Sequence, residues 1–544
     1  MMMGTLTRAL TALILALVAL PAMAATEVPR IVSKNGRHAL FVDGAPFLML
    51  GVQANNSSNY PAMLPLVWPM VERLHANTLE IPVAWEQIEP VEGKFDFSWL
   101  DTLLAQARQH DTRVVLLWFG TWKNGSSTYV PEWVKSDTAR FPRARMASGG
   151  LSSLSPFGKN TLNADRRAFV ALMTYLRDHD PDNSVIMVQT ENEAGQWQLG
   201  RDHGPEANAL FEGAVPAALV KSLGRTGGTW RQVFGKTAET AFSAWYTAQY
   251  IDSIAAAGKA IKPLPMYVNA ALSDPFNAEP DPMGVPAGGP NWTVIPIWKA
   301  AAPHIDLLAP DIYSRDWKSY NAYIGHYARP DNPFMVPETG NDVDFARFFW
   351  PVLGNGAFGF SPFGFDGDDY SNYPLGAKKL DDATVEVFAA NFRLFHPMAR
   401  AWAKIAFENP TWGVAKGPDS ADQSTVMGRW KVTTSFEQWQ FGERDWTWLK
   451  SDPHPTKGLP VGGGVVAQIG PDEFIVAGAD LRFRFSLANA APGEQSQLFR
   501  VEQGSFDANG KWVMRNVWNG DQVDYGLNLT ARPVMLRVRL GSFK

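Results

Sequence analysis

Two apolar stretches that each end in a carboxylate decide the fold: Val185-Ile-Met-Val-Gln-Thr-Glu-Asn-Glu193 and Pro333-Phe-Met-Val-Pro-Glu338. Val and Ile favour strands, and a short apolar run of this kind is typical of a strand that is buried on both faces. In parallel barrels, functional side chains lie where such strands end. The two stretches therefore predict a pair of carboxylates at the C-terminal rim of a parallel barrel.

Strand and helix signals alternate along residues 30–400. Eight runs of strand character are separated by segments with apolar residues at helical spacing. The runs are 39–51, a hairpin-like start that leads into the first barrel strand, then 77–85, 113–119, 185–193, 265–269, 305–309, 334–336 and 357–361. Eight strands alternating with helices predict an α/β fold, the (β/α)8 TIM barrel.

Two long segments, 196–237 and 273–303, follow the fourth and fifth strands of this barrel. They are rich in Gly, Pro, Asn and Trp, and they lie on the rim side. They either wall a cleft or are plain surface insertions, and the sequence leaves both possibilities open.

The pattern changes at about Thr411, where helix signals stop. Short runs of alternating polarity follow, punctuated by Gly, Asp and Asn, at 465–469, 473–476, 481–486, 497–502 and 534–540. This pattern is typical of an antiparallel β-sandwich. We therefore expect a barrel over 25–408, closed by a helical stretch that breaks near Pro397, and a C-terminal β-sandwich domain over 409–544.

Residues 1–24 have the features of an export signal. Arg8 supplies a positive charge, Ala9 to Leu20 are apolar, and Ala22-Met-Ala24 fits a small-residue cleavage site. The alternative is an uncleaved membrane anchor, although the apolar region is short for one. No later segment is long and apolar enough to span a bilayer, so we expect an exported protein in the periplasm or outside the cell.

Composition narrows the possible ligands. The 544 residues include 49 basic and 54 acidic side chains without a basic stripe, so nucleic acid is not an expected partner. Cys is absent, which excludes disulfides and thiolate metal sites, and the nine His show no metal-ligand spacing. The 21 Trp are an unusual number, and flat aromatic faces suit sugar rings.

Paired carboxylates at such a rim are the machinery of glycoside hydrolysis. Glu193 lies where the fourth strand opens into the rim, a place that suits a general acid with a raised pKa. Glu338 ends the seventh strand and would attack the anomeric carbon as an ionised nucleophile. Glu191 would share a face with Glu193 if the strand persisted, and we expect it to be a buried partner. The alternative for Glu193 is a structural role at a strand end, and for Glu338 capping or ion pairing, but the two motifs on strands four and seven reinforce each other.

The Asn-Glu of the fourth strand and the Glu of the seventh resemble the retaining glycoside hydrolase clan that is built on (β/α)8 barrels. The segment from Asn77 to Phe97, with Glu-Pro followed by Gly-x-Phe-x-Phe, resembles the second-strand region of β-galactosidase families. Glu191-Asn-Glu-Ala-Gly195 resembles an element of family 35, and 462–476 is similar to the C-terminal β-domain of its bacterial members.

This resemblance implies Glu193 as the acid/base, Glu338 as the nucleophile and Asn192 as the contact to the sugar 2-hydroxyl. Four further residues at strand ends are candidate sugar contacts: Asn55, Trp122, Asn124 and Tyr313. For these four, local capping or packing is the alternative. The chain also departs from the family, because the Cys-Ala-Glu segment that many members carry after the third strand is replaced by Trp118-Phe-Gly-Thr-Trp-Lys-Asn-Gly125.

The sequence thus predicts a retaining exo-β-galactosidase that removes terminal β-linked galactose from oligosaccharides, with plant cell-wall (xyloglucan-type) fragments as candidate substrates. Double displacement needs no metal or organic cofactor. The alternatives are a retaining β-glycosidase or glycanase of another specificity, and a non-catalytic carbohydrate-binding protein. The C-terminal domain could instead serve polysaccharide attachment or assembly. The sequence sets no oligomeric state.

Overall fold

The computed structural model describes residues 26–368 and 370–544 of the chain. The expected signal peptide, residues 1–24, lies outside these residues. Among the residues that are described, no helix has both the length and the apolar character needed to cross a membrane.

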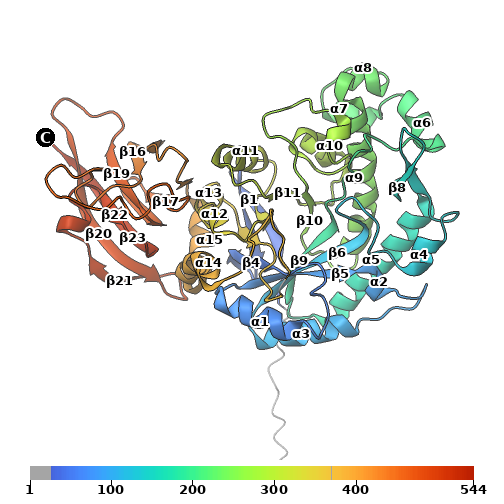
Figure 1. Cartoon of the computed structure of the whole chain (residues 1–544), viewed down its shortest axis with the longest axis horizontal. Coiled ribbons are helices and arrows are strands. Elements are labelled where there is room, and N and C mark those ends of the chain that lie inside the picture. The colour runs from blue at the N-terminus through green and yellow to red at the C-terminus, as the bar shows by residue number, and fades with distance from the viewer. Residues whose placement is uncertain (1–25, 369) are drawn as a thin grey trace, which may run out of the picture.

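The centre of the molecule is a closed barrel of eight parallel strands (Figure 1). The strands are β4 (Met49–Gln53), β5 (Thr78–Ala84), β6 (Arg113–Lys123), β9 (Val185–Asn192), β10 (Met266–Ala270), β11 (Leu307–Ile312), β12 (Val336–Thr339) and β13 (Gly359–Pro362). They follow one another around the barrel in chain order, and β13 pairs with β4 to close it. The predicted (β/α)8 fold is therefore confirmed, and each of the eight predicted runs contains or overlaps one barrel strand.

Helices surround the barrel between successive strands. They are α1 (Leu64–Arg73), α2 (Trp85–Ile88), α3 (Ser98–Gln109), α4 (Glu132–Ser136), α5 (Lys159–His179), α6 (Pro205–Glu212), α7 (Ala217–Ser222), α8 (Trp230–Phe234), α9 (Ala238–Lys259), α10 (Ile295–Ala301), α11 (Trp317–Tyr327), α12 (Val343–Ala346), α13 (Phe349–Gly354), α14 (Asp382–Phe395) and α15 (Ala399–Glu408). A short 3₁₀ turn that contains Pro397 separates α14 from α15, because proline cannot continue the hydrogen-bond ladder of a helix.

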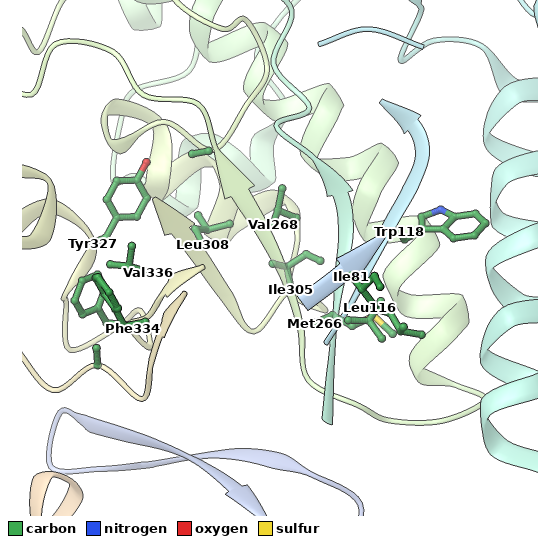
Figure 2. Close-up of a cluster of buried hydrophobic side chains, with 14 of the residues drawn as sticks. Ile81, Leu116, Trp118, Met266, Val268, Ile305, Leu308, Tyr327, Phe334 and Val336 are labelled. Atoms are coloured by element: carbon green, nitrogen blue, oxygen red, sulfur yellow. The ribbon is translucent and has the colours of Figure 1, made fainter. Parts of the chain in front are cut away.

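The barrel strands are buried on both faces, which explains their nearly continuous apolar sequences. Figure 2 shows the outer layer, in which Leu116 and Trp118 of β6 and Met266 and Val268 of β10 pack toward the helices. The alternate side chains belong to a separate cluster inside the barrel. The inward cluster includes Val115, Leu117, Phe119, Tyr267, Leu307 and Ala309.

A three-stranded antiparallel sheet closes the N-terminal end of the barrel. It consists of β1 (Arg30–Lys34), β2 (Arg37–Val42) and β3 (Ala45–Phe47). Leu40, Val42 and Phe47 belong to the same cluster as the inward side chains of the barrel strands. Because this end is plugged by apolar residues, polar groups of the interior lie toward the opposite end.

The long segments after β9 and β10 contact one another, since Gln196 and Ala287 form a bridge between them. The first carries α6, α7 and α8, and the second carries two 3₁₀ turns and α10. A further hairpin, β7 (Arg143–Arg145) with β8 (Leu151–Leu154), follows β6. The two segments therefore form one connected insertion beside the fourth and fifth strands.

The C-terminal region forms two antiparallel sheets, as predicted. Six strands make the first: β14 (Thr411–Ala415), β17 (Gly463–Gly470), β18 (Glu473–Ala479), β23 (Val534–Phe543), β20 (Gln495–Phe506) and β21 (Trp512–Val517). Four make the second: β15 (Gln423–Met427), β16 (Trp430–Ser435), β19 (Leu481–Leu487) and β22 (Leu527–Leu529). Side chains from both sheets form one apolar cluster, as in a sandwich.

The six-stranded sheet also packs directly against the barrel (Figure 1). Val465, Ile475 and Met535 belong to the same core cluster as the barrel helices. Gly354 of α13 lies so close to Gly413 of β14 that an added Cβ would come within 2.0 Å of the Gly413 nitrogen. The two parts therefore share a tight apolar interface.

Candidate active site

Glu193 lies one residue beyond the end of β9, where the backbone leaves the regular strand conformation. Glu191 and Glu193 both adopt left-handed backbone angles, with φ of 62° and 42°. Such angles are uncommon for residues other than glycine, and they concentrate at functional sites. They also break the alternation of the strand, so the condition for Glu191 and Glu193 to share a face is not met.

The backbone and side chain of Glu193 are positioned by two neighbouring strands. Its N–H donates to Oδ1 of Asn269 at 2.9 Å, and Nδ2 of Asn269 donates to Oδ2 of Asp311 at 2.7 Å. The carboxyl group of Asp311 in turn shares a hydrogen bond with that of Glu193. Asn269 therefore sets the spacing between these two carboxyl groups.

Glu338 faces the barrel interior because β12 is irregular. Val336 packs outward, and regular alternation would also turn residue 338 outward, but the register shifts between Val336 and Thr339. The carboxylate of Glu338 accepts the Tyr313 hydroxyl at 2.5 Å and Nε2 of Gln53 at 3.0 Å. These two donors fix the orientation of the Glu338 side chain.

Glu193, Asp311 and Glu338 form one acidic cluster, with one oxygen from each lying within 4.8 Å of the others. Burial of the carboxyl group, followed by the charge of Glu338, raises the pKa of Glu193 to about 7, and Lys123 opposes the rise. Burial, followed by the charges of Glu338 and Glu193, raises the pKa of Asp311 well above its usual range. The proton-bound forms of Glu193 and Asp311 are therefore favoured beside Glu338.

Glu191 occupies a different environment, between the barrel and the helices. Its carboxyl group accepts the backbone N–H groups of Thr121 and Trp122 and shares a hydrogen bond with Asp165 of α5. Both acids are buried, and burial raises the pKa of each. Two buried carboxyl groups joined by a hydrogen bond hold a proton between them. This arrangement fits the expected role of Glu191 as a buried partner.

This buried pair makes stability depend on pH. Folding raises both pKa values. The contribution of this pair to the free energy of unfolding is therefore fully present below the pKa values of the unfolded chain, and it is lost as pH rises toward the pKa values of the folded protein. We expect Glu191→Gln to flatten this decline, so that its melting temperature relative to the parent improves between about pH 5 and about pH 9. Thermal unfolding across that range measures the effect. The exposed Glu279→Gln serves as control, and a constant offset of Glu191→Gln at every pH would contradict the account.

Two of the expected sugar contacts, Asn192 and Asn55, have side-chain polar atoms without a hydrogen-bond partner among the described residues. Asn192 is fully buried, and neither Oδ1 nor Nδ2 has a partner. Asn55 is fixed by Asp366, which accepts its backbone N–H at 2.6 Å and its Nδ2 at 2.9 Å, while its Oδ1 is unpartnered. Unpaired polar atoms in a buried setting are costly unless a ligand or water satisfies them.

Two further expected sugar contacts, Trp122 and Asn124, come from the region of the third barrel strand, and they differ in burial. Asn124 is exposed in a left-handed Asn-Gly turn, where its Oδ1 accepts the ammonium group of Lys123. Trp122 is 1% exposed, donates its indole N–H to Leu154 and packs against Tyr250 of α9. The irregularity of β6 beyond Trp118 accompanies this placement, in which the Trp122 ring is buried.

Sequence reasoning missed four residues that surround the two glutamates: Gln53, Lys123, Asn269 and Asp311. Each lies at or next to the end of a barrel strand that runs further than the apolar pattern indicated. The predicted sixth strand stops at residue 309, whereas β11 continues to Ile312 and carries Asp311. A polar residue immediately after an apolar run was the signal available for all four.

Two family models match the chain. Residues 68–260 match Glyco_hydro_42, described as Beta-galactosidase, and residues 388–530 match DUF5597, described as a domain of unknown function. The first match includes β9 and the Glu193 segment. This part of the barrel is similar to a glycoside hydrolase family. A search of the curated proteins found no match.

Solved structures of β-galactosidases are similar to this chain in fold. The β-galactosidase from Bacillus circulans sp. alkalophilus aligns over 90% of this chain and 99% of its own, at 11% identity and a TM-score of 0.51. The β-galactosidase from the psychrophilic Marinomonas ef1 aligns over 66% of this chain at 13% identity and a TM-score of 0.47. This chain spans 62% of the length of the Marinomonas enzyme.

The family match refines the expectation from sequence. The resemblance pointed to family 35, whereas the family model that matches residues 68–260 is Glyco_hydro_42. The broader assignment, a β-galactosidase-type barrel of the same clan, agrees with both. The family 35 assignment itself is not supported by these matches.

Proposed function

We propose that this protein is a retaining exo-β-galactosidase that releases terminal β-linked galactose from oligosaccharides, with plant cell-wall fragments of the xyloglucan type as candidate substrates. The observation that carries the proposal is the Glu193–Glu338 pair in one acidic cluster, in a chain whose barrel matches a β-galactosidase family. A short carboxyl separation of roughly 5 Å is typical of retaining enzymes, whereas inverting enzymes need room for a water molecule.

In the first step, the Glu338 carboxylate attacks the anomeric carbon and forms a covalent ester. The bond between that carbon and the leaving oxygen breaks, and the proton of Glu193 passes to this oxygen. Glu338 is held for attack by Tyr313 and Gln53, and Glu193 is suited to donate because its pKa is raised to about 7. No metal is required, although the acidic cluster has the spacing of a cation site.

In the second step, Glu193, now a carboxylate, takes a proton from water while the water oxygen attacks the anomeric carbon. The ester bond to Glu338 breaks, and galactose leaves with its original configuration. Tyr313 and Gln53 hold the Glu338 carboxylate in place through both steps. Asn192 is the proposed contact to the sugar 2-hydroxyl, and Asn55 and Asn124 are further proposed contacts.

Asp311 completes the proton arrangement as a positioning residue. Burial raises the pKa of Asp311, which favours its protonated form, and its hydrogen bond to Glu193 lowers the pKa of Glu193 against the larger effect of burial. Lys123 acts in the same direction through its charge. Asp311 thus stabilises the carboxylate form of Glu193 that the second step needs.

The pH profile tests these proton positions. Glu193 must be protonated for the first step, so kcat/KM for a poor leaving group should fall as pH rises through about 7. Asp311→Ala removes a donor to the Glu193 carboxylate, so the alkaline limb should move to higher pH and kcat should fall about tenfold. Asp311→Asn keeps a neutral donor and should leave the limb close to its original position. Identical limbs for Ala and Asn variants would contradict the role of Asp311.

Hydrolysis of nitrophenyl β-glycosides by the purified chain tests the sugar specificity. We expect fast cleavage of the galactoside and slow cleavage of the glucoside and mannoside. Activity confined to another sugar would replace the galactosidase proposal. The stretch Trp118–Gly125 in place of the family's Cys-Ala-Glu segment is the observation that favours this second candidate, a retaining β-glycosidase of other specificity. Any turnover would exclude a purely binding function.

We further propose that the enzyme is exported and acts in the periplasm or outside the cell. The support is the charge and hydropathy pattern of residues 1–24. N-terminal sequencing of the protein from the extracytoplasmic fraction tests this proposal, with Ala25 as the expected first residue.

A further inference from the structure

A long irregular loop of the C-terminal domain, residues 436–460, displays aromatic side chains on the surface. It connects β16 to β17 and contains no helix or strand. Trp448 is 67% exposed, the largest value for any Trp among the described residues, and Tyr525 on a neighbouring turn is 50% exposed. A contiguous patch of exposed apolar side chains often marks an interaction site, whereas single exposed residues are common on any protein surface.

These rings form an ordered group rather than isolated exposed residues. Trp446 and Trp448 lie 5.0 Å apart between ring centres, with planes tilted by 32°. Phe441 lies 5.7 Å from Trp446 and 6.5 Å from Trp448, with tilts of 36° and 33°. Tyr525 contacts the edge of Phe441 at 5.6 Å. We call Phe441, Trp446, Trp448 and Tyr525 the aromatic platform.

The backbone beneath the aromatic platform is fixed by a buried cation. Arg482 of β19 is 1% exposed, and its guanidinium donates to the carbonyl groups of Trp439, Gln440 and Gly526. These bonds join the loop to the turn that carries Tyr525. Because both segments are held by one guanidinium, the platform is preorganised, which lowers the entropic cost of binding.

A cavity of about 530 Å³ adjoins the loop and is rich in hydrogen-bonding side chains. Its lining includes Gln438, Gln440, Asp521, Gln522 and Asn528. Oε1 of Gln438 is buried without a partner, and so is Nε1 of Trp446 on the platform. Amide and carboxylate groups beside aromatic rings offer both kinds of contact that a sugar needs, since its hydroxyls form hydrogen bonds and its C–H faces pack on rings.

Charge argues for a neutral ligand. Residues 436–460 contain four acidic and three basic side chains, and the turn 519–526 adds Asp521 and Asp524. This balance disfavours nucleic acids and anionic membranes, which bind basic surfaces.

The loop is also tied to the active-site side of the barrel. Lys416 pairs with Glu437 at 2.5 Å and donates to the Thr456 carbonyl, and its own carbonyl accepts from Arg347. Arg347 also donates to the carbonyl of Arg315, two residues after Tyr313. A polymer held by the loop would therefore be held by a part of the molecule that is coupled to the catalytic rim.

We propose that the aromatic platform and its polar cavity form a binding site for a neutral β-linked polysaccharide, separate from the catalytic cluster. The C–H faces of the sugar rings in such polymers can pack on the exposed ring of Trp448 and on its tilted neighbours. The site would retain the enzyme on the polymer from which its substrates derive. The choice of a polysaccharide rests on the proposed glycosidase function, but its test does not depend on turnover.

Affinity electrophoresis in gels that contain xyloglucan or β-1,4-galactan, with a pull-down on microcrystalline cellulose, tests the site. The full chain with Glu338→Gln is used throughout so that no polymer is degraded. We expect retardation by at least one polymer, and about tenfold weaker binding after Trp448→Ala is added. Phe499→Ala, which removes a 55% exposed ring from β20 of the same domain, should bind like the Glu338→Gln parent.

Several outcomes would overturn this proposal. The first is an absence of retardation in both gels together with an absence of binding to cellulose. The others are equal weakening by Phe499→Ala, and unchanged binding after Trp448→Ala and Trp446→Ala. Binding of phosphatidylcholine vesicles or self-association that Trp448→Ala removes, without polysaccharide binding, would assign the platform to another partner. Trp448→Ala in the otherwise unaltered enzyme should keep full activity on nitrophenyl galactoside. Failure of that activity in the unaltered enzyme would count against the proposed function and not against the site.

Discussion

Replacing Glu338 with Gly is expected to lower turnover by at least about 10⁴-fold, or about 5.4 kcal/mol of transition-state stabilisation. The variant lacks the group that attacks the anomeric carbon, and neither Tyr313 nor Gln53 can replace it, since both serve as donors to that carboxylate. Rates on nitrophenyl galactoside measure the loss. Glu338→Gln keeps the shape of the side chain and should be equally inactive, which separates loss of the nucleophile from creation of a cavity.

Azide gives this prediction a stereochemical readout. In the Glu338→Gly variant, azide should enter the vacated space, attack from the same side as the missing carboxylate and restore turnover of activated galactosides. The product should be the α-galactosyl azide, because a single displacement inverts the anomeric centre. Formation of the β-azide would contradict the assignment of Glu338 as nucleophile.

Replacing Glu193 with Ala should affect substrates according to their leaving groups. A poor leaving group needs the proton of Glu193 in the first step, so its kcat/KM should fall by about 10²–10⁴-fold. A dinitrophenolate leaves without protonation, so its kcat/KM should change little. Glu86→Ala is a suitable control, because Glu86 is a partly exposed glutamate paired with Lys135.

The second step gives an independent test of the Glu193 role. Without a general base, the covalent intermediate should accumulate, and azide should release it as the β-galactosyl azide with net retention. An equal loss on good and poor leaving groups, with no rescue, would contradict the assignment of Glu193 as acid/base. The opposite configurations expected for the Glu193 and Glu338 variants distinguish the two roles within one assay.

The barrel could be predicted from sequence because each of its strands and helices has a signal in its own local sequence. Strands such as 113–119 and 185–193 are buried on both faces, so their apolar runs are almost uninterrupted, and helical segments with 3.6-residue spacing separate them. The change of pattern at about Thr411 marks the start of β14, since solvent-facing strands alternate in polarity. Pro397 likewise predicted the break between α14 and α15.

The details of the site could not be predicted, because they depend on departures from regular strands. Left-handed angles at Glu191 and Glu193 send these two side chains to different environments, although simple alternation places them together. The register shift in β12 turns Glu338 inward, and the irregular end of β6 accompanies the packing of Trp122 between the barrel and α9. Asp311 was missed because β11 extends beyond its apolar core through a polar residue.

Trapping of the covalent intermediate tests the central claim most directly. The purified enzyme would be incubated with 2,4-dinitrophenyl 2-deoxy-2-fluoro-β-galactoside, whose fluorine slows both steps while the good leaving group keeps the first step accessible. Intact mass and peptide mapping would then locate the label. The account predicts one fluorogalactosyl group per chain, attached to Glu338 and lost on reactivation. A label on another residue, or steady turnover without any covalent species, would contradict it.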